Sequence, residues 1–355
     1  MPTHALRAGA VAVALALGVA GCTKSAPEPK PAADRPSVAF VVPSTDLNFA
    51  KEMATGFGFG VSQVGGVDFT VAGTSRMDNA GEAKIFEDLV KNKKADAGIS
   101  VFMQAQDLFA PLIADAHTRN IPMIAVDNRM DATSKVDLFV GNDNYKLGQM
   151  LADEAIGKLP ARASGDVVLG TSVPGVPVLE LRAKGMRDEF HTKLPNVNVL
   201  GPFDTKQDPL VNMSAWESLV SANAGALAYL GTGDADAYNL AAIRKKTNGT
   251  WVGGGFDLDP RSLQAVKDGD IVLVSPEHFI KGAIAGRLQA QHAKDGKPLP
   301  TGWIYTPGLA VNKGNIDEIT KRQESDANKQ AWFAPKIDEI LTDKKEYLRP
   351  LTDAP

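Results

Sequence analysis

The chain has 355 residues, of which 44% are hydrophobic, so it can bury a large core, and its length suggests about two domains. Its formal net charge is −4 and no basic patch or stripe stands out, which argues against nucleic acid as a partner. Cys22 is the only cysteine. If Cys22 is modified, no disulfide can form, and the fold must be stabilised by packing, which suits a large α/β protein.

The N-terminal segment is typical of a bacterial lipoprotein. Residues 8–20 are apolar or glycine without interruption, Arg7 supplies a positive flank, and the run ends at Val19-Ala20-Gly21-Cys22. Such a run is shorter than the roughly 20 residues of a membrane-spanning helix and suits a signal peptide. The alternatives are an ordinary signal peptide or a buried helix with an incidental cysteine. We expect a lipoprotein signal peptide at residues 1–21 and a lipid on Cys22, which would tether the protein to a bacterial membrane outside the cytoplasm.

Residues 22–36 are rich in proline, alanine and charge and lack apolar periodicity, which predicts a flexible, solvated linker. From Ser37 onward, short apolar strands alternate with amphipathic helices. The first predicted strands are residues 37–42, 67–72, 95–101 and 123–126, and the first predicted helices are residues 48–64, 80–93 and 108–119.

A second set of elements continues the alternation. Its predicted strands are residues 137–140, 166–169, 197–200, 226–230, 251–252 and 271–274, and its predicted helices are residues 145–158, 178–193, 210–221, 235–246, 261–267 and 279–293. Continuously apolar strands separated by helices indicate parallel sheets covered on both faces, and the right-handed crossover rule makes such sheets doubly wound. We predict an α/β fold with two doubly wound, Rossmann-like parallel-sheet lobes and a cleft between them.

The carboxyl ends of the predicted strands, where open α/β sheets bind their ligands, are unusually polar. Carboxylates can accept hydrogen bonds from vicinal hydroxyls, arginine can donate several, and amides can do both. An apolar sugar face can stack on an aromatic ring. These residue types indicate a neutral polyhydroxyl ligand. The candidate ligand-binding residues are Phe49, Phe102, Asp127, Asn128, Arg182, Phe203, Asp234, Asp257 and Glu277.

The order and spacing of several segments resemble the type I periplasmic binding proteins of the ribose- and galactose-binding group. The matching segments are Phe49 after the opening strand, residues 121–128, residues 140–144 with Leu147-Gly148, residues 182–185 and residues 255–257. The resemblance extends over about residues 37–311, which is nearly the whole of the expected mature domain.

The resemblance implies that Phe49 stacks on a sugar. Asp127 and Asp257 would accept hydrogen bonds from its hydroxyls on opposite sides, and Arg182 would donate to them. Asn142 and Asp143 would belong to a hinge. From the residues alone, the two aspartates could instead cap the turns or helices that follow. Arg182 could equally be a solvated helix residue, and Phe49 a core residue.

Three departures from the family's pattern concern the ligand. Asn128 stands where arginine is common, with Arg129 next, and Gly233 replaces an asparagine before Asp234. A common glutamine has no clear match among residues 275–277. We therefore do not expect a plain ribose site.

The resemblance also implies discontinuous lobes joined by a multi-strand hinge. The N-terminal lobe would comprise residues 37–142 plus 276–305, and the C-terminal lobe residues 143–275 plus 306–314. Residues 315–355 form a charged C-terminal extension, in which we expect one or two surface helices. Its expected docking contacts are Trp332, Phe333, Ile337 and Ile340.

No motif indicates catalysis. The sequence lacks His-Glu-x-x-His, Gly-x-Ser-x-Gly and Walker A motifs, and its five histidines are scattered. We expect no enzymatic activity, no cofactor and no metal. The expected function is that of a monomeric lipoprotein that captures a sugar or polyol between its lobes and delivers it to the permease of an ABC transporter. The alternative is a sugar-sensing lipoprotein that presents its ligand to a receptor or histidine-kinase ectodomain.

Overall fold

The computed structural model describes residues 35–130, 134–136 and 138–355. The expected signal peptide, Cys22 and nearly all of the expected linker lie outside the described residues. Residues 35–355 belong to one compact unit. Within the described ranges, no helix is long and apolar enough to cross a membrane.

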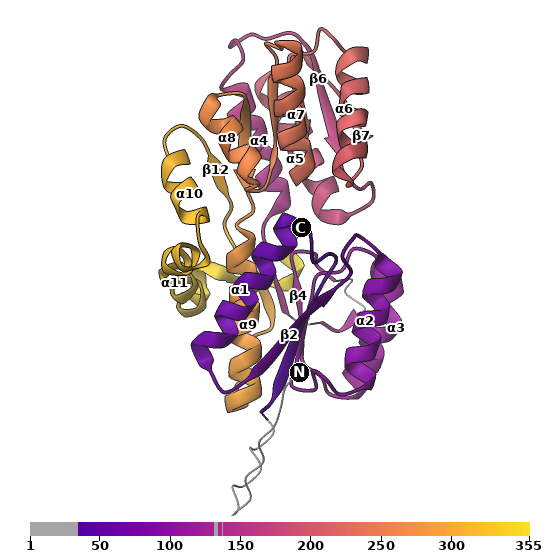
Figure 1. Cartoon of the computed structure of the whole chain (residues 1–355), viewed down its shortest axis with the longest axis vertical. Helices are drawn as coiled ribbons and strands as arrows, with labels where there is room; N and C mark the ends of the chain where they lie inside the picture. Colours follow the sequence, from indigo (N-terminus) through magenta and orange to yellow (C-terminus); the bar gives the residue numbers. More distant parts are fainter. Residues whose placement is uncertain (1–34, 131–133, 137) are drawn as a thin grey trace, which may run out of the picture. The chain divides into compact units, whose positions relative to one another are not determined.

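Seven strands form the first sheet (Figure 1), in the order β13-β11-β5-β4-β3-β1-β2. Neighbouring strands are parallel, except that β13 pairs antiparallel with β11 at one edge. The strands are β1 (Ser37–Val42), β2 (Asp68–Gly73), β3 (Ile99–Val101), β4 (Met123–Val126), β5 (Leu138–Gly141), β11 (Gly302–Tyr305) and β13 (Leu348–Arg349).

Six strands form the second sheet, in the order β12-β10-β9-β8-β6-β7. This sheet is parallel apart from its edge strand β12, which runs antiparallel to β10. The strands are β6 (Gly165–Thr171), β7 (Val197–Asp204), β8 (Ala228–Gly231), β9 (Val252–Phe256), β10 (Ile271–Ser275) and β12 (Leu309–Val311). The two sheets therefore confirm the predicted α/β fold with two doubly wound lobes.

Helices cover both faces of the first sheet. They are α1 (Asn48–Val64), α2 (Asn79–Lys91), α3 (Gln106–Thr118), α9 (His278–Asp295), α11 (Asp326–Thr342) and α12 (Lys344–Tyr347). Alternate residues of a strand point to opposite faces of its sheet. Val38 and Phe40 accordingly pack with α1, α9 and α11, whereas Ala39 and Val41 pack with α2 and α3.

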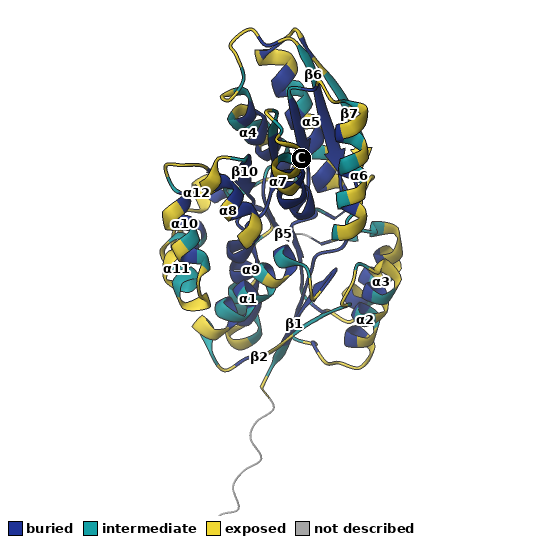
Figure 2. Ribbon diagram, turned by 45° about the horizontal axis from the view of Figure 1, so that its top comes forward, coloured by how far each residue is buried: buried dark blue, intermediate teal, exposed yellow. Residues whose placement is uncertain are grey.

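The second sheet is also sandwiched between helices. They are α4 (Asn144–Ile156), α5 (Pro177–Lys193), α6 (Pro209–Ala222), α7 (Asp234–Thr247), α8 (Pro260–Asp268) and α10 (Ile316–Gln323). Val167 and Leu169 pack with α4 and α5, and Val168 packs with α6 and α7 on the other face. In both lobes the central strands are buried, and the exposed residues lie on the outer surfaces of the helices, in loops and on the edge strands β2 and β7 (Figure 2).

Glycines bring two helix pairs into backbone contact. A Cβ atom at Gly56 or Gly60 of α1 would lie 2.0 Å from a carbonyl oxygen of α9, and a Cβ at Gly148 of α4 would lie 2.1 Å from the Arg182 carbonyl oxygen in α5. Only glycine leaves room for this approach. The contact of α4 with α5 therefore fixes the backbone from which Arg182 projects.

The chain passes between the two lobes four times. The crossings lie between β5 and α4, between β10 and α9, between β11 and β12, and between α10 and α11. The Asn142 side chain in the first crossing donates to the Thr306 carbonyl oxygen in the third at 2.7 Å. It also accepts from Lys281 Nζ, in the first turn of α9, at 2.8 Å. Asn142 thus links residues at or next to the first three crossings.

The sequence predicted β1, α1 and β4 to the residue, but it did not predict β11, β12 or β13 as strands. Each of these three is short, and a proline lies close to one end of each: Pro307 between β11 and β12, and Pro350 directly after β13. The expectation of one or two helices in the extension was also wrong, because residues 315–355 form three helices, a 3₁₀ turn and the edge strand β13. Phe333, Ile337 and Ile340 are buried as expected, whereas Trp332 is 39% exposed.

Candidate functional site

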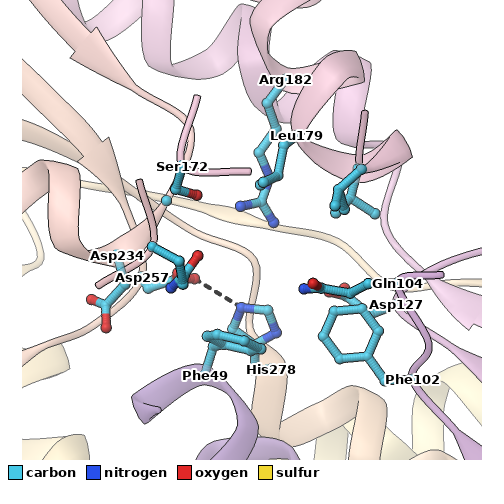
Figure 3. A pocket seen from close by; sticks show the side chains of 14 residues that line it. Phe49, Phe102, Gln104, Asp127, Ser172, Leu179, Arg182, Asp234, Asp257 and His278 are labelled. Carbon is cyan, nitrogen blue, oxygen red and sulfur yellow. Dashed lines mark hydrogen bonds and ion pairs between the residues drawn. The ribbon is translucent and has the colours of Figure 1, made fainter. Parts of the chain in front are cut away.

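A small cavity lies where the carboxyl ends of the two sheets face each other. Both lobes contribute to its wall, and their side chains converge on it from all sides (Figure 3). The lining residues are Phe49, Phe102, Gln104, Asp127, Ser172, Val176, Val178, Leu179, Arg182, Gln207, Gly233, Asp234, Asp257 and His278.

Asp127 and Asp257 occupy equivalent positions in the two lobes. Each directly follows a central strand, has a positive φ of 66° or 73°, and donates its backbone N–H to the next strand of its sheet. Non-glycine residues are uncommon in this left-handed region and are often functional. Neither side chain caps a helix, since Asp259 is the residue that caps α8. Both carboxylates reach the cavity instead, which decides against the capping alternative.

Asp127 is held in its charged form. Its carboxylate forms a fully buried ion pair with Lys281, whose Nζ also donates to Asn142. Burial alone would raise the pKa of Asp127, but the charges of Lys281, His278 and Arg182 lower it to about 2. Lys281 was not among the expected residues. Its side chain is 0% exposed, and nothing in the sequence distinguishes it from a surface lysine of an amphipathic helix.

Arg182 projects from α5 into the same cavity. Its Nε donates to the Asn144 side chain at 3.0 Å and its Nη1 donates to the Thr232 carbonyl oxygen at 2.9 Å. The guanidinium also lies 4.4 Å from the centre of the Phe256 ring. These contacts leave one edge of the guanidinium directed at the cavity (Figure 3).

His278 brings the lobes together at the cavity. It is the first residue of α9, in the N-terminal lobe, and its Nε2 lies 2.8 Å from a carboxylate oxygen of Asp257, in the C-terminal lobe. His278 was not among the expected residues, because the family's pattern pointed to residues 275–277. The signal in the sequence was a histidine directly after these three residues, where the chain leaves β10.

Part of the remaining wall is apolar. Phe49 packs edge-on against Phe102, with ring centres 5.9 Å apart, and the Phe49 ring also lies 5.8 Å from His278. Opposite them, on the C-terminal lobe, Leu179 and its neighbours Val176 and Val178 face the cavity. These three residues were not anticipated, because they lie on α5 and the loop before it rather than directly after a strand.

Three lining groups have no hydrogen-bond partner in the described part of the chain. They are Ser172 Oγ, Asp234 Oδ1 and His278 Nδ1, and all three are buried. Buried polar atoms are normally satisfied, so these atoms point to a polar ligand. Burial raises the pKa of Asp234 well above its usual range, and the charges of Asp257 and Asp259 raise it further. A raised pKa favours the protonated carboxyl, which is the form that can donate a hydrogen bond as well as accept one.

Three of the nine expected residues do not line this cavity. The side chain of Asn128 turns away and donates to the Met103 carbonyl oxygen at 2.8 Å. Phe203 lies at the end of β7 and is 40% exposed, because that strand is at the edge of its sheet. Glu277 forms an ion pair with Arg322 behind the cavity. The other six, Phe49, Phe102, Asp127, Arg182, Asp234 and Asp257, come together.

The described conformation is closed. Asp127, Arg182 and Asp257 are only 2, 3 and 4% exposed, although they come from different lobes. Among the residues that the structure describes, no group of histidine, cysteine and acidic side chains is placed to hold a metal ion. What the site offers is two carboxylates, one guanidinium, several unpaired polar atoms and two aromatic rings.

Residues 38–298 match the family model described as the periplasmic binding protein domain, and the chain belongs to that family. No curated protein sequence matches it. Solved structures with a similar fold include an ABC transporter solute-binding protein from Agrobacterium vitis with bound D-fucose. It is 20% identical, with a TM-score of 0.72, over 79% of this chain and 97% of that one.

Two further structures show the same likeness. A carbohydrate transporter solute-binding protein from Agrobacterium radiobacter, in complex with D-arabinose, is 21% identical over 88% of this chain and 100% of that one, with a TM-score of 0.72. A glucose-galactose binding protein from Geobacillus stearothermophilus is 20% identical over 79% and 98%, with a TM-score of 0.69. At these identities the comparison establishes the fold, which is that of a type I periplasmic binding protein.

Proposed function

We propose that this protein is an extracytoplasmic solute-binding protein that captures a sugar or polyol between its lobes and delivers it to the permease of an ABC transporter. The observation that carries the proposal is the closed cavity, in which two carboxylates and an arginine are buried together with unpaired polar atoms. Capture by closure requires no bond to be made or broken, so no catalytic group is needed.

The chemistry of the wall fits a polyhydroxyl ring. Asp127 and Asp257 can each accept hydrogen bonds from hydroxyls, and Arg182 can donate through its free edge. Ser172 and Asp234 add a donor or an acceptor on one flank of the cavity. Hydrogen bonds to charged groups contribute about 1.5–3 kcal/mol each, so a few of them suffice for tight binding. The rings of Phe49 and Phe102 can cover apolar C–H faces of the same ligand.

The solved relatives support the ligand class. Two of these relatives are complexes with D-fucose and D-arabinose, and the third is a glucose-galactose binding protein. Their shared feature is a small monosaccharide. We carry over this class, and not any one of these sugars, because sequence identity is about one residue in five.

A panel of pentoses, hexoses and polyols, added to the purified protein during thermal unfolding, tests this function. At least one member is expected to raise the melting temperature, because a ligand at a hundredfold excess over its dissociation constant stabilises the native state by about 2.7 kcal/mol. The same ligand should reduce the radius of gyration in small-angle scattering, since the lobes close over it. A panel with no stabilising member would contradict the proposal.

Import and sensing are separated by the phenotype of a deletion strain. Loss of uptake of the bound sugar supports delivery to a permease. Normal uptake with a lost transcriptional response to that sugar would instead favour the sensor.

We also propose that Cys22 carries a lipid that anchors the protein, a monomer, to a bacterial membrane. The support is the apolar run that ends at Val19-Ala20-Gly21-Cys22. Mass spectrometry of the chain expressed in bacteria should find a lipid-modified N-terminus at Cys22. Cys22→Ala should release the protein from the membrane while sugar binding stays intact, because the anchor precedes the linker. An unmodified Cys22 within a differently cut N-terminus would rule the anchor out.

A further inference from the structure

The C-terminal extension, residues 315–355, packs on both lobes. Ile316 and Ile319 of α10 join the core that contains α8 and β10 in the C-terminal lobe. Phe333 of α11 joins the core of the N-terminal lobe, where its ring stacks on Phe279 of α9 with centres 5.1 Å apart. The junction of α10 and α11, at Glu324-Ser325, is therefore a fourth connection between the lobes. It lies beyond residues 38–298, the part that matches the family.

Arg322 stands at this fourth connection, in the last turn of α10. Its two terminal nitrogens donate to the two carboxylate oxygens of Glu277, at 2.7 and 3.0 Å. Both side chains are buried, and the guanidinium also lies 4.7 Å from the centre of the Phe333 ring. A bidentate pair of this kind fixes geometry as well as charge. Arg322 thus ties α10 and α11 to a residue of the second crossing.

Glu277 is the residue that leads into the ligand site. It lies between β10 and α9 with a φ of 55°, a left-handed conformation that is unfavourable for a residue with a side chain. Such a conformation persists only when the surroundings enforce it. The next residue is His278, which begins α9 and meets Asp257 across the cavity.

A second, smaller cavity lies directly behind the site. Glu277, Arg322 and Phe333 line it on the side of the extension. Phe49, Asp257 and His278 line it as well, and the same three residues line the ligand cavity. One wall of the ligand site is therefore supported from behind by the extension.

We propose that Arg322 is a positioning residue of the ligand site, which holds Glu277 so that His278 meets Asp257 when the lobes close. The role in ligand binding rests on the proposed function. Without Arg322 the buried Glu277 carboxylate has no counter-charge, and burying an unpaired charge is costly. Glu277 then turns toward water, its backbone leaves the left-handed conformation, and His278 moves with it.

Arg322→Met in the full chain tests this role. With D-galactose, D-arabinose and D-fucose as probes, affinity is expected to fall at least tenfold for whichever sugar the wild type binds. The side-chain ¹⁵N signals of His278, assigned by their loss in His278→Gln, should shift in the free protein as well. Arg322→Lys keeps the positive charge but cannot form the bidentate pair with Glu277. It should therefore restore part of the affinity and part of the wild-type His278 signal.

Lys329→Met is the matched control. Lys329 belongs to the same extension and forms its ion pair at 2.8 Å with Glu52 of α1. Glu52 also lines the second cavity, so this variant removes a neighbouring ion pair of the extension while the contact of Arg322 with Glu277 stays in place. The loss of Lys329 should change affinity less than threefold and leave the His278 signals in place. The double variant Arg322→Met/Glu277→Gln removes the unpaired charge, so it should fold even if Arg322→Met does not, yet its affinity should stay low.

Two results would overturn the proposal. One is an unchanged His278 signal in a folded Arg322 variant. The other is an equal loss of affinity in Lys329→Met, which would mean that the extension only stabilises the fold. If the wild type binds none of the probes, the sugar-binding function fails, and the His278 signals still decide whether Arg322 positions that residue.

Discussion

Asp257→Ala is expected to weaken ligand binding by about 30- to 150-fold while the ligand-free protein melts almost as before. The loss corresponds to about 2–3 kcal/mol for a charge-assisted hydrogen bond to a ligand hydroxyl. Stability should hardly change, because the only partner of the Asp257 carboxylate in the described structure is His278, across the closed cavity. Calorimetry measures the affinity for the ligand, and melting curves of the ligand-free protein measure its stability.

Asp127→Ala should behave differently. It is expected to lose affinity to a similar extent and also to destabilise the free protein by about 3–5 kcal/mol, because Lys281 is left buried without its counter-charge. Asp204→Ala is the control: Asp204 also ends a strand of the C-terminal lobe, but it lies outside the cavity and pairs with exposed Lys206. Normal affinity in Asp257→Ala, or a large loss in Asp204→Ala, would show that the site is misplaced.

Glu82→Gln is expected to stabilise the protein strongly at alkaline pH and little at pH 5. Glu82 of α2 is 0% exposed, and neither of its carboxylate oxygens has a partner among the described residues. Burial raises the pKa of Glu82 from 4.5 to about 8. The folded protein therefore binds this proton more tightly than the unfolded chain does. The contribution of Glu82 to the free energy of unfolding is therefore complete below pH 4.5, and it is lost as the pH rises toward 8.

The free energy of unfolding is expected to fall by about 1.4 kcal/mol per pH unit between pH 4.5 and pH 8, or on the order of 4–5 kcal/mol across the whole interval. Denaturant unfolding at pH 5 and pH 8.5 measures it. Glu87→Gln on the same helix is the control, since Glu87 is partly exposed and pairs with Lys84 and Lys91. An identical decline with pH in wild type and Glu82→Gln would mean that Glu82 does not titrate in this way.

The fold and half of the site could be predicted because both follow from local pattern. Each lobe repeats apolar strands and amphipathic helices, and the strand-end rule then placed Asp127 and Asp257 in one cleft. The same rule placed Phe203 and Glu277 there, and for them it was not sufficient. The rule does not say whether a strand is central or at the edge of its sheet, and Phe203 lies on the edge strand β7. It also does not say which way a side chain turns, and the Glu277 side chain turns away to pair with Arg322.

The missed residues depend on contacts between distant segments. His278 meets Asp257 across the two lobes, and Lys281 meets Asp127 over 154 positions of sequence. The sequence pattern around Lys281 is typical of a lysine on the exposed face of an amphipathic helix. Only the packing of α9 in the closed structure shows that Lys281 is buried. The extension was misjudged for a similar reason, because Arg322 acquires its role from Glu277, and the charged pattern around it resembles that of a solvated helix.

The threading of the chain through both lobes determines when folding can finish. The first sheet needs β11 and β13, and the second needs β12, so neither sheet is complete before residues beyond 300 have left the ribosome. Pairings between such distant segments form slowly, and a domain folds as a unit once its parts are present. We therefore expect both lobes to finish folding only after most of the chain has been synthesised. A late finish of this kind would keep an exported chain able to pass through a narrow channel and complete its fold on the far side.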